Sequence, residues 1–211
     1  EPGLMSLCSP DPQAFRPPEE KANVLHVGLP TNFKAARFED AAHNEMLEEL
    51  EADIAAVTLD GKDVPVKLKV FDSLFVPLAK WSMLLTGNYR CITLGGVRPI
   101  REAVHGDAEV ARSVYGYVDK LAQRLGADPA DQVPFEKYAN AAQSLAKPSS
   151  AARAIAAGAI DIERVDRLVQ LIGEALGMRH AAVDAVVRVV NSRLTDNQMW
   201  DEIADQARSA A

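Results

Sequence analysis

The pattern of apolar and polar positions divides the chain into an N-terminal part with extended segments and a longer helical part. Residues 1–22 hold five of the twelve prolines, which predicts an extended arm or linker. The short apolar run 23–30 ends in Gly28 and Pro30, and this predicts a strand with a turn behind it.

A helix and a hairpin are predicted next. Residues 40–52 place Met46, Leu47 and Leu50 among glutamates at helical spacing, which is typical of an amphipathic helix. The apolar runs 57–59 and 64–68 flank an Asp-Gly pair, so we expect them to form the two strands of a β-hairpin.

Beyond Phe71 the pattern becomes helical and stays so to the C-terminus. Residues 74–86 are apolar on nearly every side, which predicts a buried helix, and the glycine-containing residues 88–99 predict a loop. Further helices are predicted over residues 107–125, 135–146, 149–158, 162–177 and 183–190.

The last helix is predicted to begin separately. Thr195 or Asp196 is suited to its N-cap, and we expect Trp200 and Ile203 to face inward. The fold class is therefore mainly α, with a boundary between an N-terminal arm, strand and hairpin (1–69) and an all-helical domain (70–211). No Gly-x-Gly-x-x-Gly loop and no βαβ series is recognised.

Composition narrows the possible functions. The chain has 211 residues, of which 48% are hydrophobic and 25% charged, as in a soluble globular protein. A net charge of −7 argues against binding to duplex nucleic acid, and 6% aromatics argue against stacking on single strands. The sequence contains no apolar run of about 18 residues, so no membrane span is expected. We expect a cytoplasmic protein, with Cys8 and Cys91 as reduced thiols.

Catalytic motifs are scarce. The sequence lacks the His-Glu-x-x-His and Gly-x-Ser-x-Gly patterns and a phosphate-binding loop. Its four histidines do not cluster, so no metal site is expected.

Lys80 lies within the apolar run and is the first candidate for chemistry. A lysine there must pair with an acidic group, line a cavity, or extend its ammonium group to solvent. Extension to solvent is the commonest of the three. Desolvation would lower its pKa toward the range that suits a general acid or base. Asn88 follows two helical turns later and could share its helix face.

Two predicted helix starts form the second candidate. Ser149 and Ser150 follow Lys147-Pro148, and Asp161 stands near the start of the next helix. These side chains could converge on one pocket, although serine and aspartate at such positions are commonly ordinary N-caps.

The order of these features resembles the helical substrate domain of the ketopantoate reductases, within the wider 6-phosphogluconate-dehydrogenase-like group. That family has a Trp-x-Lys followed by asparagines four and eight residues after the lysine. Leu78-Ala79-Lys80 is similar to the first element, and Asn88 stands at the second asparagine. Residues 147–150 resemble the family's Pro-Ser-Ser helix start, and residues 161–167 resemble its Thr-Glu-Ile-Asp segment.

The resemblance implies an NADP-dependent reductase of a 2-oxo acid, with a multi-helix fold like the 6-phosphogluconate dehydrogenase C-terminal domain. Lys80 would be the general acid, while Asn88, Ser149 or Ser150, and Asp161 would hold the substrate. The family's cofactor domain would precede this chain, so the chain alone is not expected to bind NADP tightly. A homodimer is also expected.

Three positions depart from the family pattern. Leu84 stands at the first asparagine, Leu78 replaces the tryptophan, and Asp161 replaces a glutamate. A substrate other than ketopantoate is therefore expected, because a lost hydrogen-bonding partner changes which polar groups a site accepts. The alternative hypothesis is a non-catalytic helical dimerisation or interaction module of the same fold.

Overall fold

The computed structural model describes residues 2–8, 14–15, 20–21, 24, 26–27, 31–64 and 66–209. As predicted, it is mainly helical, with a few short strands. The chain forms two compact units. Unit 1 comprises Glu1–Lys80 and Ala122–Gln132, and unit 2 comprises Trp81–Leu121 and Val133–Ala211.

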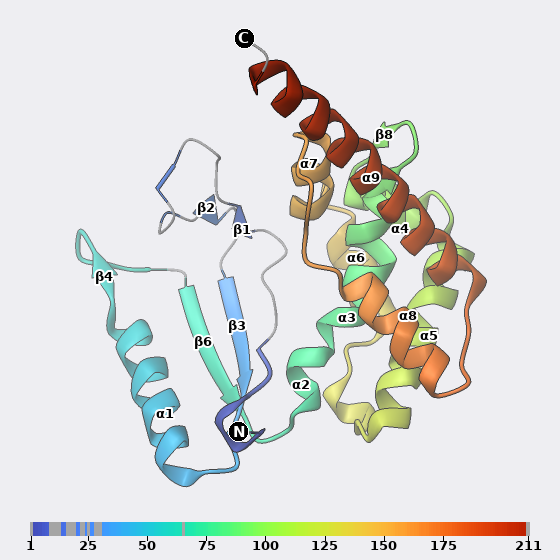
Figure 1. Ribbon diagram of the computed structural model, residues 1–211. Helices are drawn as coiled ribbons and strands as arrows, with labels where there is room; N and C mark the ends of the chain where they lie inside the picture. The colour runs from blue at the N-terminus through green and yellow to red at the C-terminus, as the bar shows by residue number, and fades with distance from the viewer. Residues whose placement is uncertain are drawn as a thin grey trace. The chain divides into compact units, whose positions relative to one another are not determined.

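Unit 1 is built on two parallel strands. Strand β3 (Thr31–Ala36) pairs with β6 (Val66–Phe71) in the register Thr31 opposite Val66 to Ala36 opposite Phe71. Helix α1 (Ala41–Ala56) connects the two strands and contacts β6 (Figure 1). This is a βαβ connection, which the pattern of apolar residues did not reveal.

The predicted hairpin is correct in its turn and wrong in its second strand. Strand β4 (Thr58–Leu59) pairs antiparallel with β5 (Lys62–Asp63) around Asp60 and Gly61, and both turn residues have positive φ. Residues 66–68 of the expected second strand belong to β6 instead, and residue 65 lies outside the described residues.

The N-terminal segment adds short elements to unit 1. Turn η1 (Pro2–Leu4) comes first, and β1 (Ala14–Phe15) pairs antiparallel with β2 (His26–Val27). Strand β2 lies within the strand predicted over 23–30, whose residues 23, 25 and 28–30 lie outside the described residues. Helix α2 (Phe75–Leu78) and turn η4 (Pro129–Asp131) complete the unit.

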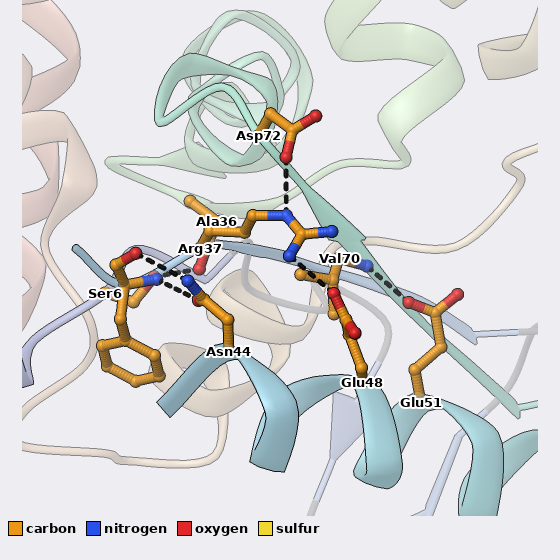
Figure 2. A network of polar contacts seen from close by, with 9 residues as sticks. Ser6, Ala36, Arg37, Asn44, Glu48, Glu51, Val70 and Asp72 are labelled. Carbon is orange, nitrogen blue, oxygen red and sulfur yellow. Dashed lines mark hydrogen bonds and ion pairs between the residues drawn. The ribbon is translucent and has the colours of Figure 1, made fainter. Parts of the chain in front are cut away.

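Polar contacts hold α1 in place. Asp40 caps the helix by accepting from the Ala42 N–H at 2.8 Å. The Asn44 carboxamide bonds both backbone groups of Phe38, at 2.7 and 2.9 Å. Arg37 connects Glu48 of α1 with Asp72, with both ion pairs at 2.5 Å (Figure 2).

Glu51 attaches α1 to strand β6. Its carboxylate accepts a hydrogen bond from the Val70 N–H at 2.9 Å (Figure 2). It accepts another from the Lys69 ammonium at 2.8 Å. These two bonds hold the pKa of Glu51 below its usual value. The side chain thus satisfies a backbone donor of β6 that the β3 ladder does not use, which is one way to protect a sheet edge.

Protonation of Glu51 is therefore expected to weaken unit 1. Because the folded-state pKa is lowered, this stability is present above the ordinary glutamate pKa of about 4.3 and is lost as pH falls through the folded-state value. Glu51→Gln should remove this pH dependence and cost at most about 1 kcal/mol, since the contact is partly solvated. Hydrogen exchange at the Val70 amide measures the effect, with exposed Glu49→Gln as the control; equal exchange in both variants would contradict it.

Unit 2 consists of helices around one apolar core. Its helices and strands are α3 (Lys80–Met83, beginning at the last residue of unit 1), η2 (Leu84–Asn88, a π-helical turn), η3 (Tyr89–Cys91), β7 (Ile92–Thr93), β8 (Gly96–Val97), α4 (Ile100–His105), α5 (Ala108–Leu125, whose last turn belongs to unit 1), α6 (Phe135–Ala142), α7 (Ser150–Ala156), α8 (Val165–Ala175) and α9 (Ala181–Ser209). The largest fully buried side chains include Leu85, Ile100, Tyr115, Leu121 and Ile155.

Helix boundaries differ most from the prediction in two places, and the loop predicted over 88–99 contains η3 and a short hairpin of β7 and β8. The buried helix predicted over 74–86 is divided into α2, α3 and the π-helical turn η2. The last two predicted helices are one continuous α9, so neither Thr195 nor Asp196 is an N-cap. The inward orientation of Trp200 and Ile203 is also wrong, since they are 70% and 52% exposed. In the described part of the chain, no helix combines the length and apolar composition needed to cross a membrane.

Candidate functional site

The π-helical turn η2 places polar side chains in the core of unit 2. Thr86 is fully buried, and its hydroxyl has no hydrogen-bond partner among the described residues. Asn88 is 5% exposed, and no hydrogen bond joins its carboxamide to another described residue. An unpaired buried polar group costs about 1–3 kcal/mol, and π-helical turns occur frequently at functional sites. A polar ligand would compensate this cost.

Ser149 meets this turn from a distant part of the chain. It is the N-cap of α7, where its Oγ accepts from the Ala152 N–H at 3.1 Å. The same hydroxyl donates to the backbone oxygen of Asn88 at 2.8 Å. Ser149 also hydrogen-bonds the buried Cys91 thiol; burial raises the pKa of that thiol, and the bonds from Ser149 oppose the rise. Ser149 thus fixes the start of α7 against the end of η2.

Tyr89 attaches the segment before α8 to the same place. Its hydroxyl donates to the Glu163 carbonyl at 2.5 Å and accepts from the Val165 N–H at 3.0 Å. Burial raises the pKa of this hydroxyl, so it stays protonated and can continue to donate. The backbone that carries Asp161 and Glu163 is therefore held beside η3.

Arg90 supplies positive charge next to the turn. It is 8% exposed and donates to the Thr86 carbonyl at 3.4 Å, a long and weak hydrogen bond. It forms no ion pair with a described residue. Burial lowers its pKa, and the nearby Arg98 lowers it further. The arginine remains charged all the same, because a guanidinium is too basic to lose its proton in a protein. A carboxylate would be a favourable partner for it.

The structure brings several predicted site residues together. Asn88 and Ser149 are in direct contact, and Ser150 is the half-buried first residue of α7. Asp161 is exposed and stands two residues before Glu163, whose carbonyl is bonded to Tyr89. Lys80 is half-buried and is the last residue of unit 1, whereas the other four belong to unit 2. Their roles in substrate binding stay predictions.

Three residues of the site were not predicted. Thr86, Tyr89 and Arg90 lie within or next to the apolar run and the predicted loop. Polar residues inside a run that is otherwise apolar all round are a signal that could have identified Thr86. Nothing in the sequence shows that the hydroxyl of Tyr89 reaches residues 163–165.

The β3–α1 connection of unit 1 does not fit the pyrophosphate of a dinucleotide cofactor. In unit 1 the β3–α1 connection is the position where a βαβ unit binds phosphate, through a glycine-rich turn and a free helix N-terminus. Here the connection carries Glu39 and Asp40, contains no glycine, and its N-terminal Ala42 N–H is already bonded to Asp40. Among the residues described, no group of three or more histidine, cysteine, aspartate or glutamate side chains could hold a metal ion.

Comparison of the chain with protein-family models, with curated proteins and with solved structures gives no match.

Proposed function

We propose that unit 2 binds a 2-oxo acid as the substrate-binding part of an NAD(P)-dependent reductase. The observation that carries this proposal is the buried Thr86 hydroxyl, which lacks a partner among the described residues. It lies in a turn that is held from two sides and that also carries the Asn88 carboxamide. A hydroxyl, a carboxamide and the Arg90 guanidinium together suit a small molecule with a carboxylate and a carbonyl oxygen. The motif order that resembles ketopantoate reductases supports the same assignment.

Each candidate residue then has a distinct role. Asn88 donates its amide N–H to an oxygen of the substrate, and Arg90 offsets the carboxylate charge. Ser149 acts through its backbone contacts as a positioning residue, because its proton is already donated to Asn88. Ser150 and Asp161 contact the remaining polar groups. Lys80 belongs to unit 1, and its role as proton donor to the carbonyl oxygen rests on the resemblance to ketopantoate reductases alone. The hydride comes from NAD(P)H, for which the β3–α1 connection offers no phosphate site.

Titration calorimetry with 2-oxoisovalerate tests the substrate assignment on the chain itself. We expect binding to the wild type, and about tenfold weaker binding or worse for Asn88→Ala, because a buried donor is lost. Isovalerate, which lacks the 2-oxo group, should also bind more weakly.

The matched control is Asn191→Ala, which removes an exposed asparagine from α9. Circular dichroism checks that both variants keep the helical content of the wild type. The proposal fails if 2-oxoisovalerate and related 2-oxo acids do not bind, or if the two variants lose affinity equally.

A non-catalytic dimerisation module is the second candidate, and two observations favour it. Leu84, at the position of the family's first asparagine, is 6% exposed and presents only apolar atoms. On α8, Leu168 and Leu171 are 44% and 45% exposed and could form a homodimer contact. This candidate predicts a dimer in light scattering that Leu168→Glu dissociates, together with no binding of 2-oxo acids.

A further inference from the structure

The C-terminal end of α9 extends beyond the core of unit 2 (Figure 1). The last contacts that attach it are Asn197, which donates to the carbonyls of Ile155 and Ala159 at 2.9 and 2.8 Å, and Gln198, which donates to that of Ile160 at 3.0 Å. In the described residues 199–209, no side chain is buried. This end of the helix therefore gains no stability from the core.

The same end carries large apolar side chains. Met199, Trp200 and Ile203 are 55%, 70% and 52% exposed. Residues 199 and 203, and likewise 200 and 203, are one helical turn apart, so the three form one continuous apolar patch. Tryptophan is among the residues that contribute most to binding at protein interfaces, and a helix end of this length is marginal in water by itself.

Acidic residues are frequent along this end of the helix, and two of them, Asp196 and Glu202, lie one helical turn from Met199. Asp196, Asp201, Glu202 and Asp205 are all exposed, and the only basic residue in the described stretch 195–209 is Arg208, which pairs with Asp205. Two copies of this helix end placed together would bring like charges next to each other. This repulsion disfavours a second copy as the occupant and favours a positively charged one.

We propose that the end of α9, residues 196–208, is a docking surface for a basic amphipathic helix of a partner protein. Trp200 is the apolar anchor, with Met199 and Ile203 beside it. The carboxylates of Asp196 and Glu202 bind lysine or arginine side chains on the edge of the partner helix. The mode is that of an amphipathic helix recognised by its apolar stripe and its charged flanks.

The probe is a synthetic helical peptide of leucine and lysine, and its matched partner has glutamate in place of every lysine. Tryptophan fluorescence reports the contact directly, because Trp81 is 9% exposed and already shielded from water whereas Trp200 is exposed. We expect the basic peptide to shift the emission to shorter wavelength in a saturable way that weakens with added salt. The acidic peptide should cause no shift.

Variants localise the binding by titration calorimetry. Trp200→Ala should weaken binding of the basic peptide about tenfold or more. The double variant Asp196→Lys with Glu202→Lys should weaken it similarly, while Glu45→Lys with Glu49→Lys, the same charge change on the exposed face of α1, should have little effect. The proposal is overturned if both double variants weaken binding equally, if Trp200→Ala binds like the wild type, or if light scattering shows a dimer that Trp200→Ala dissociates.

Discussion

Replacing Gly87 with alanine is expected to destabilise unit 2 by about 2–3 kcal/mol, the upper range for overpacking a core. Gly87 lies in the π-helical turn, and a Cβ built there would stand 1.9 Å from the Tyr138 hydroxyl oxygen and 3.2 Å from Ile100. Tyr138 cannot move away at low cost. It is 7% exposed, its hydroxyl donates to the Met83 carbonyl at 3.2 Å, and its ring stacks on Tyr115.

Gly116→Ala provides the matched control for this prediction. Gly116 lies inside α5, where an added Cβ meets no atom within 4 Å outside the helix's own backbone. The same chemical change should there stabilise the protein by about 0.5–1 kcal/mol, because alanine is the better helix former. Urea unfolding of both variants, followed by circular dichroism, measures the difference. If neither variant loses stability, the π-helical turn is less tightly packed than the contacts around Gly87 indicate.

Arg164→Ala is expected to cost about 3 kcal/mol, because it leaves a buried carboxylate without its cation. Asp166 is fully buried, and Arg164 bonds both of its oxygens, at 2.8 and 2.9 Å. The pair stands at the start of α8, directly after the segment that Tyr89 holds. The loss should therefore also loosen the backbone around Asp161 and Glu163.

Two comparisons test this explanation. Arg167→Ala removes an exposed arginine three residues later and should change the free energy of unfolding by less than about 0.5 kcal/mol. Asp166→Asn, introduced into the Arg164→Ala variant, should restore part of the stability, since it removes the unpaired charge. If the double variant is no more stable than Arg164→Ala alone, the cost does not come from the buried charge.

Much of the helical part could be predicted from residue periodicity. The errors of that prediction have physical causes. The apolar positions Val165, Leu168, Val169 and Ile172 predicted α8, because a helix with one apolar stripe buries that stripe. Leu168 is the exception on this face, since it is 44% exposed. The break at Thr195 and Asp196 was wrong, because good N-cap residues do not end a helix whose backbone bonds continue. Buried Leu194 and the bonds of Asn197 hold α9 to unit 2 across that point.

The parallel strands of unit 1 could not be predicted from the sequence. β3 reads Thr-Asn-Phe-Lys-Ala-Ala, which has few β-branched residues and no clear alternation. Its pairing with β6 is a long-range contact across α1 and the small β4–β5 hairpin. Local pattern carries no information about such a pairing, and residues 64–68 were therefore assigned to the neighbouring hairpin.

The candidate site could likewise be predicted only in part. Asn88, Ser149 and Asp161 were selected by motif order, and the structure places Asn88 against Ser149 although 61 residues separate them. Thr86, Tyr89 and Arg90 contribute through burial and through contacts that only the folded chain creates. Whether a polar residue has a partner cannot be predicted from its own position in the sequence.

The central claim is that the π-helical turn of unit 2 binds a 2-oxo acid through Asn88. The most direct measurement is nuclear magnetic resonance of the isotopically labelled chain during titration with 2-oxoisovalerate. We predict saturable shifts of the Asn88 side-chain amide and of the backbone amides of residues 84–91 and 149–152, with the Asn191 side-chain amide unchanged. Saturable shifts confined to other parts of the chain, or no shifts at all, would contradict the account.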